Sequence, residues 1–88
     1  MKLSLQEKIY KACAHEKRLE ILRLLKSTRY LTVGSIARSL GLSIQTTSKH
    51  LQVLERAHII DREKEGLEVY YSAKRPASPL ARTIISFL

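Results

Sequence analysis

Several residue types are scarce in this sequence, and each scarcity excludes a class of protein. One cysteine among 88 residues cannot form an internal disulfide, which excludes a disulfide-stabilised scaffold. Three glycines and two prolines, beside 44% hydrophobic residues, exclude a low-complexity or disordered chain. The sequence has no apolar run near the roughly 20 residues of a membrane span and no secretory signal pattern. We therefore predict one folded domain over residues 1–88, cytoplasmic and not in a membrane.

Acidic residues are also scarce relative to basic ones. Sixteen Lys and Arg stand against eight Asp and Glu, which gives a formal net charge of +8. A positive balance of this kind most often serves attraction to a polyanion, and nucleic acid is the first candidate. Because a basic surface can also serve solubility alone, the inference of nucleic-acid binding requires a binding site in addition to the charge.

The spacing of apolar residues predicts five helices and a hairpin. We expect the helices over residues 3–14, 16–27, 36–40, 44–57 and 79–88. β-forming residues precede the third helix, which Gly41 ends because glycine adopts the left-handed conformation easily. Ser43 is the expected N-cap of the fourth helix. The alternating segment IIDREKEGLEVYYS predicts two antiparallel strands joined by a turn.

The fourth helix has two contrasting faces. At about 100° per residue, one sector is apolar and is expected to face the core. This sector holds Ile44, Thr47, Leu51 and Leu54. The opposite side carries amides, hydroxyls and cations, namely Gln45, Thr46, Ser48, Lys49, Gln52 and Arg56. These groups hydrogen-bond base edges in the major groove of DNA, whereas an ordinary solvated helix face is the alternative interpretation.

The order of the elements favours the DNA interpretation. A short helix, a turn containing Gly41 and the fourth helix form a helix-turn-helix arrangement, and the hairpin follows it as a wing would. We therefore predict a mainly α fold with a small β-hairpin, a winged helix-turn-helix, that binds double-stranded DNA.

Two segments, HEKRLEILRLL and LTVGSIARSLGLSIQTTSKHLQVLERAHIIDREKEGLEVYYSA, resemble the ArsR-type winged helix-turn-helix transcriptional regulators. The resemblance covers residues 5–74, and LSIQTTSKHLQVLERA is its most specific part. It implies a homodimeric repressor of a palindromic operator, with the fourth helix in the major groove and the wing on the neighbouring backbone. The implied DNA contacts are Ser43, Gln45, Thr46, Thr47, Ser48, Lys49, His50 and Gln52 on the helix, with Arg62 and Lys64 on the wing. His50 either supports the helix or bonds a phosphate.

The resemblance also implies that the terminal helices, residues 1–14 and 77–88, form the dimer interface. Their apolar stripes lack an obvious partner within the domain, and a two-fold axis would bury both. The stripes consist of Leu5, Ile9, Cys13, Leu80, Ile84, Phe87 and Leu88. The alternative is that these helices cap their own core.

The sequence departs from the family at its metal sites. Many members bind metal through paired cysteines in the third helix or through His, Asp and Glu in the last. The segments SIARSLG and SPLARTIISFL carry none of these residues, so we predict no metal site and no cofactor. An effector response through Cys13 remains an alternative, although a cysteine on an apolar stripe usually belongs to the core.

Two further departures concern the hairpin. The family usually has glycine after the fourth helix, but this chain has His58, which must adopt the left-handed conformation or reshape the turn. The wing is rich in glutamate, so Arg62 and Lys64 must carry its DNA contact. The acidic wing also supports a second hypothesis, a winged-helix module that binds protein. An enzyme is the weakest hypothesis, because no catalytic constellation stands at plausible spacing.

Overall fold

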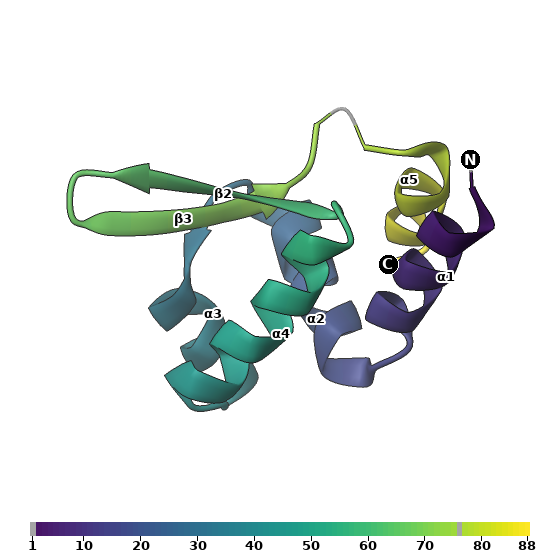
Figure 1. Cartoon of the computed structure of the whole chain (residues 1–88). Helices are drawn as coiled ribbons and strands as arrows, with labels where there is room; N and C mark the ends of the chain where they lie inside the picture. Colours follow the sequence, from purple (N-terminus) through teal and green to yellow (C-terminus); the bar gives the residue numbers. More distant parts are fainter. Residues whose placement is uncertain (1, 76) are drawn as a thin grey trace.

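The computed structural model describes residues 2–75 and 77–88. The domain predicted over residues 1–88 also includes Met1 and Pro76, which lie outside the described residues. Within these ranges, five helices and a three-stranded antiparallel sheet form a mainly α winged helix-turn-helix (Figure 1). The helices are α1 (Leu3–Cys13), α2 (Glu16–Ser27), α3 (Val33–Leu40), α4 (Ile44–Arg56) and α5 (Pro79–Ser86). The strands are β1 (Leu31–Thr32), β2 (Ile60–Glu65) and β3 (Glu68–Ala73). The predicted fold class is confirmed.

Side-chain caps define where four of the helices begin. His15, Thr32, Ser43 and Ser78 each accept a hydrogen bond from a backbone N–H in the first turn of the helix that follows. These bonds satisfy donors that have no partner inside the helix. The predicted cap at Ser43 is therefore present, with its Oγ 3.1 Å from the backbone nitrogen of Thr46.

The two turns that flank α4 use the left-handed conformation. Gly41 has φ 68° and ends α3, while the backbone N–H of Leu42 donates to the carbonyl of Ala37. His58, which follows α4, has φ 58°. The chain therefore adopts the left-handed conformation at this residue, one of the two arrangements expected from the sequence. The backbone N–H of His58 donates to Glu55, and that of Ile59 donates to Leu54, so the turn closes the helix despite the strain on a non-glycine residue.

The core lies between the helices and the base of the sheet. It includes Ile21 of α2, Ile36 of α3, Leu51 and Leu54 of α4, and Ile60 of β2, none of which is more than 2% exposed. Ile44 was expected among them, but it is 54% exposed. The helical wheel gives the direction of its side chain, yet Ile44 is the first residue of α4 and lies beyond the end of the core.

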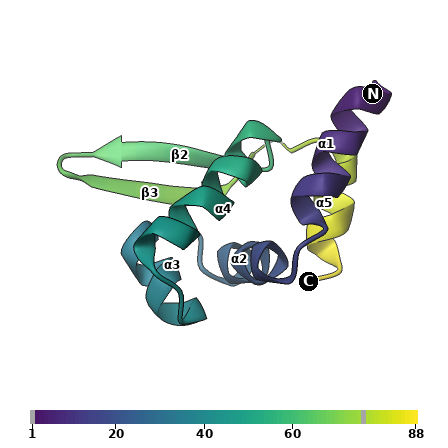
Figure 2. The ribbon, with the colours of Figure 1, turned by 60° about the horizontal axis from the view of Figure 1, so that its bottom comes forward.

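The terminal helices pack side by side at the end of the molecule opposite the hairpin tip, and α1 also contacts α2 and α4 (Figure 2). Ile9 and Cys13 are buried inside their own chain, at 1% and 8% exposure. The prediction that these two residues form a dimer interface is therefore wrong, because they have little surface left to bury. Leu5, Leu80, Ile84 and Leu88 are half-buried against the same core, whereas Phe87 is 84% exposed.

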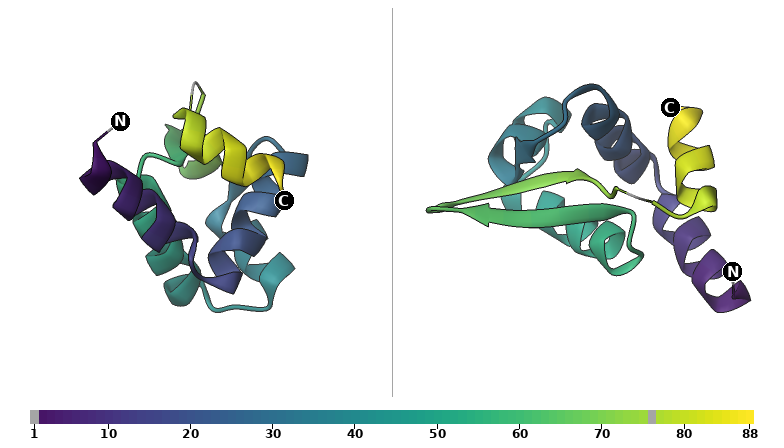
Figure 3. Two further views of the ribbon diagram at one scale, coloured as in Figure 1. Left: turned by 90° about the vertical axis from the view of Figure 1, so that its right-hand side faces the viewer. Right: turned by 90° about the horizontal axis from the view of Figure 1, so that it is seen from above.

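The hairpin of β2 and β3 projects from the domain above α3 and α4 (Figures 1 and 3). β3 is the central strand, with β1 on one side and β2 on the other. β1 pairs only Leu31 and Thr32, so within the described residues no third strand extends the distal half of the hairpin. No helix in the described ranges is long and apolar enough to cross a membrane.

Candidate nucleic-acid interface

The first turn of α4 is fixed to the rest of the domain by Thr47. Its side chain is fully buried at 0% exposure, and its Oγ1 donates to the carbonyl of Ser43 over 2.8 Å. The prediction that Thr47 contacts DNA is therefore wrong, because a ligand cannot reach this hydroxyl without unfolding the turn. Its place in the sector of Leu51 and Leu54 already indicated the core.

The rest of α4 presents an open polar face. Five of its polar side chains are exposed, namely Gln45, Thr46, Lys49, Gln52 and Arg56, while Ser48 is half-buried. The first turn contains no acidic residue, and the one carboxylate of the helix, Glu55, lies in its last turn. The N-terminal end of a helix carries a partial positive charge that favours anions. The surface can therefore donate hydrogen bonds to base edges and lie close to phosphates.

His50 lies at the edge of this face and belongs to a cluster that joins three helices. The Nε of Arg18 in α2 donates to its Nδ1 over 3.2 Å, and the Nη1 of Arg18 donates to the carbonyl of Lys11 in α1. The ring of His15 lies 4.6 Å from the ring of His50, centroid to centroid. Of the two roles left open for His50, these contacts favour support of the helix.

The cluster also sets the protonation of His50. Burial lowers the pKa of the imidazole below its usual value, and the nearby charges of His15 and Arg18 lower it further. Because Nδ1 accepts the bond from Arg18, the neutral ring carries its proton on Nε2. No sequence pattern identified Arg18 as the residue that orients His50, since 32 residues separate the two.

The register of the hairpin separates its charges by face. Residues directly opposite one another share a face, so Arg62 lies with Tyr71 and Lys64 with Val69. The carboxylates occupy the other face, where Asp61 lies opposite Ser72, Glu63 opposite Tyr70 and Glu65 opposite Glu68.

The two faces of the hairpin meet different parts of the domain near its base. Tyr71, which shares a face with Arg62, packs against the core, while Leu25 of α2 lines a cavity on the carboxylate face. The glutamates of the wing and its two cations therefore lie on opposite faces of the hairpin. The contact of the wing through Arg62 and Lys64 stays a prediction, and both side chains are exposed.

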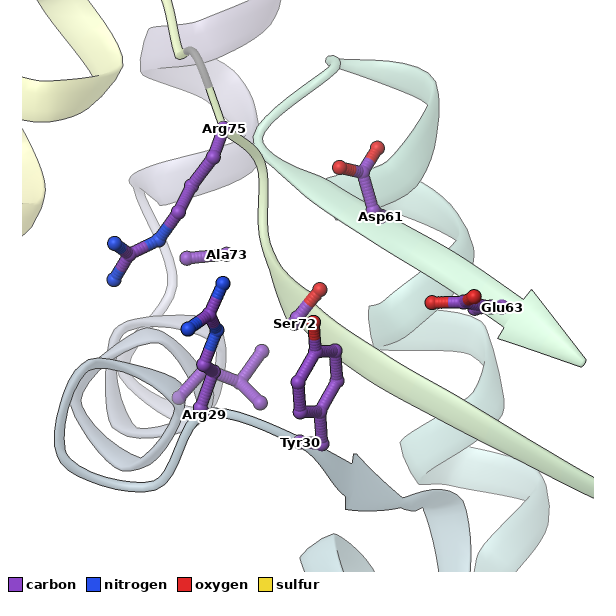
Figure 4. A pocket seen from close by; sticks show the side chains of 8 residues that line it. Arg29, Tyr30, Asp61, Glu63, Ser72, Ala73 and Arg75 are labelled. Atoms are coloured by element: carbon purple, nitrogen blue, oxygen red, sulfur yellow. The ribbon is translucent and has the colours of Figure 1, made fainter. Parts of the chain in front are cut away.

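A small polar cavity lies on the carboxylate face of the hairpin, near its base (Figure 4). It has a volume of about 200 Å³, and its lining includes Arg29, Tyr30, Glu63 and Arg75. Asp61 also lines it and pairs with Lys74 at 3.2 Å. Because this cavity opens on the face away from Arg62 and Lys64, it is separate from the α4 surface.

Three large apolar side chains are exposed on the terminal helices or next to them. Leu3 and Tyr10 of α1 are 81% and 59% exposed, and Phe87 follows α5. Leu3 and Tyr10 also line one shallow hollow together with Glu7 and Lys11. The sequence pattern missed Leu3 and Tyr10, because they lie beside the stripe of Leu5 and Ile9 rather than within it.

Cys13 is a poor candidate for a reactive group. Burial raises the pKa of its thiol, and the positive charge of Arg18 only partly offsets this effect. A raised pKa keeps the sulfur protonated, and the thiolate is the form that reacts or binds metal. Among the described residues, no group of three or more His, Cys, Asp and Glu side chains could hold a metal ion.

Comparison with known proteins gives consistent matches. The model of a family described as a helix-turn-helix domain matches residues 14–63. The transcriptional repressor PagR of Bacillus anthracis is 36% identical over 76 residues, which cover 86% of this chain and 76% of PagR. Its crystal structure superposes with a TM-score of 0.81 at 33% identity, covering 97% of this chain and 93% of PagR.

Two other solved structures superpose with similar TM-scores. Reduced HlyU from Vibrio cholerae has a TM-score of 0.82 at 32% identity, covering 97% of this chain and 85% of HlyU. A solution structure from Mycobacterium bovis has a TM-score of 0.83 at 28% identity, covering 97% of this chain and 75% of that one. The latter is described as the homodimeric winged helix-turn-helix DNA-binding domain of a possible ArsR-family transcriptional regulator.

Proposed function

This chain belongs to the ArsR-type winged helix-turn-helix transcriptional regulators, a non-enzymatic class, and we propose that it is a homodimeric repressor of a palindromic operator in double-stranded DNA. The observation that carries the proposal is the open polar face of α4, which contains no carboxylate in its first turn. We place the protein in the cytoplasm, because the similar proteins are bacterial regulators and bacterial DNA lies there.

The proposed recognition helix is α4. A major groove accommodates one α-helix, and its base edges accept or donate hydrogen bonds to amides and hydroxyls. Gln45 and Gln52 supply two amides, while Thr46, Ser43 and Ser48 supply hydroxyls. Lys49 pairs with a phosphate, and the Nε2–H of the neutral His50 ring is available as a donor at the edge of the groove.

The wing contributes backbone contacts through its cationic face. Arg62 and Lys64 share one face of the hairpin, and the carboxylates lie on the other. Exposed charges that lie farther apart than the Debye length, about 8 Å at physiological salt, are largely screened from one another, and side chains on opposite faces of a sheet point away from one another. The acidic composition of the wing is therefore compatible with phosphate contact.

We propose that residues 1–88 form a single domain whose terminal helices make the dimer interface. The exposed Leu3, Tyr10 and Phe87 supply its apolar surface, and the half-buried Leu5, Leu80, Ile84 and Leu88 border them. A two-fold axis would bring each apolar side chain against its counterpart or a neighbour. It would also present two α4 helices to one side of a duplex, about one helical turn apart.

Selection of bound sequences from a pool of random duplexes tests the proposal. We expect a palindromic motif whose half-sites lie about one turn of DNA apart, because a two-fold dimer binds symmetric half-sites. Gln45→Ala should change the preferred base at one position of each half-site, since an amide discriminates between base edges. If no motif is enriched and no duplex is retarded at low salt, the chain does not act through DNA. A protein ligand whose binding is insensitive to Lys49→Ala would then support the interaction module.

A further inference from the structure

Ile44 is an exposed apolar side chain at the N-terminal end of α4, beside the polar face of that helix. It is the first residue of α4, is 54% exposed and is absent from the residues that pack against the core. Its neighbours Ser43 and Gln45 are also exposed. In Figure 2 this end of α4 lies beside α3, far from the terminal helices. Ile44 therefore has no role in the core and lies outside the proposed dimer interface.

The position of Ile44 is fixed before any ligand arrives. The first turn of α4 is held by the Ser43 cap on Thr46 and by the bond from Thr47 to the Ser43 carbonyl. Isoleucine in a helix also has one strongly preferred χ1 rotamer. A contact with this side chain consequently requires little ordering.

We propose that Ile44 contacts the C5-methyl group of a thymine in each half-site, and that this contact helps determine the operator sequence. The inference rests on the proposed function, in which the N-terminal residues of the recognition helix lie against base edges. Thymine is the base that presents an apolar group in the major groove, since the other edges present donors and acceptors. Burial of the isoleucine side chain against that methyl contributes favourable free energy, whereas contact with a polar base edge contributes none.

The other exposed large hydrophobic side chains lie elsewhere. Leu3 and Tyr10 belong to α1, Phe87 directly follows α5, Tyr30 precedes β1, and Leu67 lies at the tip of the hairpin. Ile44 is thus the large apolar side chain that α4 exposes. Single exposed apolar residues are common on proteins, so the test must be specific for the methyl group.

Replacement of single thymines by deoxyuridine provides that specificity, because it removes the C5-methyl and leaves the hydrogen-bonding groups unchanged. The duplex is the sequence selected from the random pool, and binding is measured by fluorescence anisotropy. We expect one thymine position per half-site at which the replacement weakens binding about fourfold, the effect of roughly one buried methyl group. Replacement in both half-sites should weaken binding by about the square of that factor.

The variant Ile44→Ala tests whether Ile44 is the residue that detects the methyl. It should bind the thymine duplex more weakly and should bind the thymine and deoxyuridine duplexes equally. Leu67→Ala is the matched control, because it removes an aliphatic side chain that is 100% exposed on another element. This control should keep the sensitivity to deoxyuridine. Thermal unfolding should be nearly the same for all three proteins, which excludes misfolding as the cause.

The outcomes separate this inference from the proposed function. If the wild-type protein binds no duplex, the proposed function fails. If it binds a selected operator but tolerates deoxyuridine at every position, the inference is overturned while DNA binding stands. If Ile44→Ala retains the sensitivity, another residue contacts the methyl and the inference is overturned as well.

Discussion

Replacement of Lys49 by alanine should reduce the salt dependence of DNA binding by an amount that follows from the structure. Lys49 is exposed on the open face of α4 and forms no ion pair within the described part of the chain. Its ammonium is therefore available to a phosphate, and its removal breaks no contact inside the domain. We expect the free energy of unfolding to change by less than about 0.5 kcal/mol.

The size of the effect comes from counterion release. Each phosphate that a protein neutralises on B-DNA contributes about 0.9 to the slope of log affinity against log salt concentration. A dimer carries two copies of Lys49, so the slope should become about 1.8 units shallower. Between 50 and 200 mM salt, the affinity difference between wild type and variant should then shrink by about 12-fold.

Fluorescence anisotropy of a labelled operator, titrated at four or more KCl concentrations, measures this slope directly. Arg75→Ala is the matched control, because Arg75 is an exposed cation that lines the cavity on the carboxylate face of the hairpin (Figure 4). The control should keep the wild-type slope. An unchanged slope for Lys49→Ala would refute the assignment of Lys49 to a phosphate, and an equal loss in Arg75→Ala would indicate a general charge effect.

Three further predictions concern the wing, the turn after α4 and the histidine cluster. Arg62→Ala should weaken operator binding, and Glu63→Gln should change it less, because the two residues lie on opposite faces of the hairpin. Equal changes in affinity, measured by anisotropy, would contradict this separation. His58→Gly should raise the free energy of unfolding by about 0.5–1 kcal/mol, because a left-handed non-glycine residue costs more than glycine's extra chain entropy. A lower melting temperature in calorimetry would disprove it. Because the pKa of His50 is lowered on folding, the unfolded chain binds more protons, so stability should fall as pH drops below about 6.5. His50→Gln should flatten this fall in denaturant titrations, and identical pH profiles would count against the cluster.

Local sequence signals were sufficient to predict the elements and their order. Ser43 and Gly41 act on backbone groups within a few residues, so the cap and the turn around α4 are visible in the sequence. The alternation in IIDREKEGLEVYYS likewise predicts the hairpin, because the pleat places every second residue on the same face. These interactions act over short separations, and the structure confirms the elements they predict.

Periodicity gave the direction of a side chain but not the position where the core ends. Thr47 and Ile44 fall in the same sector of α4, yet one is fully buried and the other is 54% exposed. The difference arises because α2, α3 and β2 all pack against α4, and the placement of these elements sets where the core ends along the helix. For the same reason, the apolar stripe of α1 correctly predicted that Ile9 and Cys13 are buried, but it did not predict that the chain's own core buries them.

The contacts that join distant segments were decided by the tertiary structure alone. The bond between Arg18 and His50 requires the start of α2 to lie against the middle of α4, and nothing within either segment specifies that approach. Similarly, the alternation of charges in the wing is local, but the packing of Tyr71 against the core, which orients the hairpin on the domain, is not. The sequence by itself therefore determined the helices, the hairpin and the polar face of α4, because these depend on neighbours along the chain. The limits of the core, the orientation of the wing and the support of His50 depend on packing between elements, which only the folded chain provides.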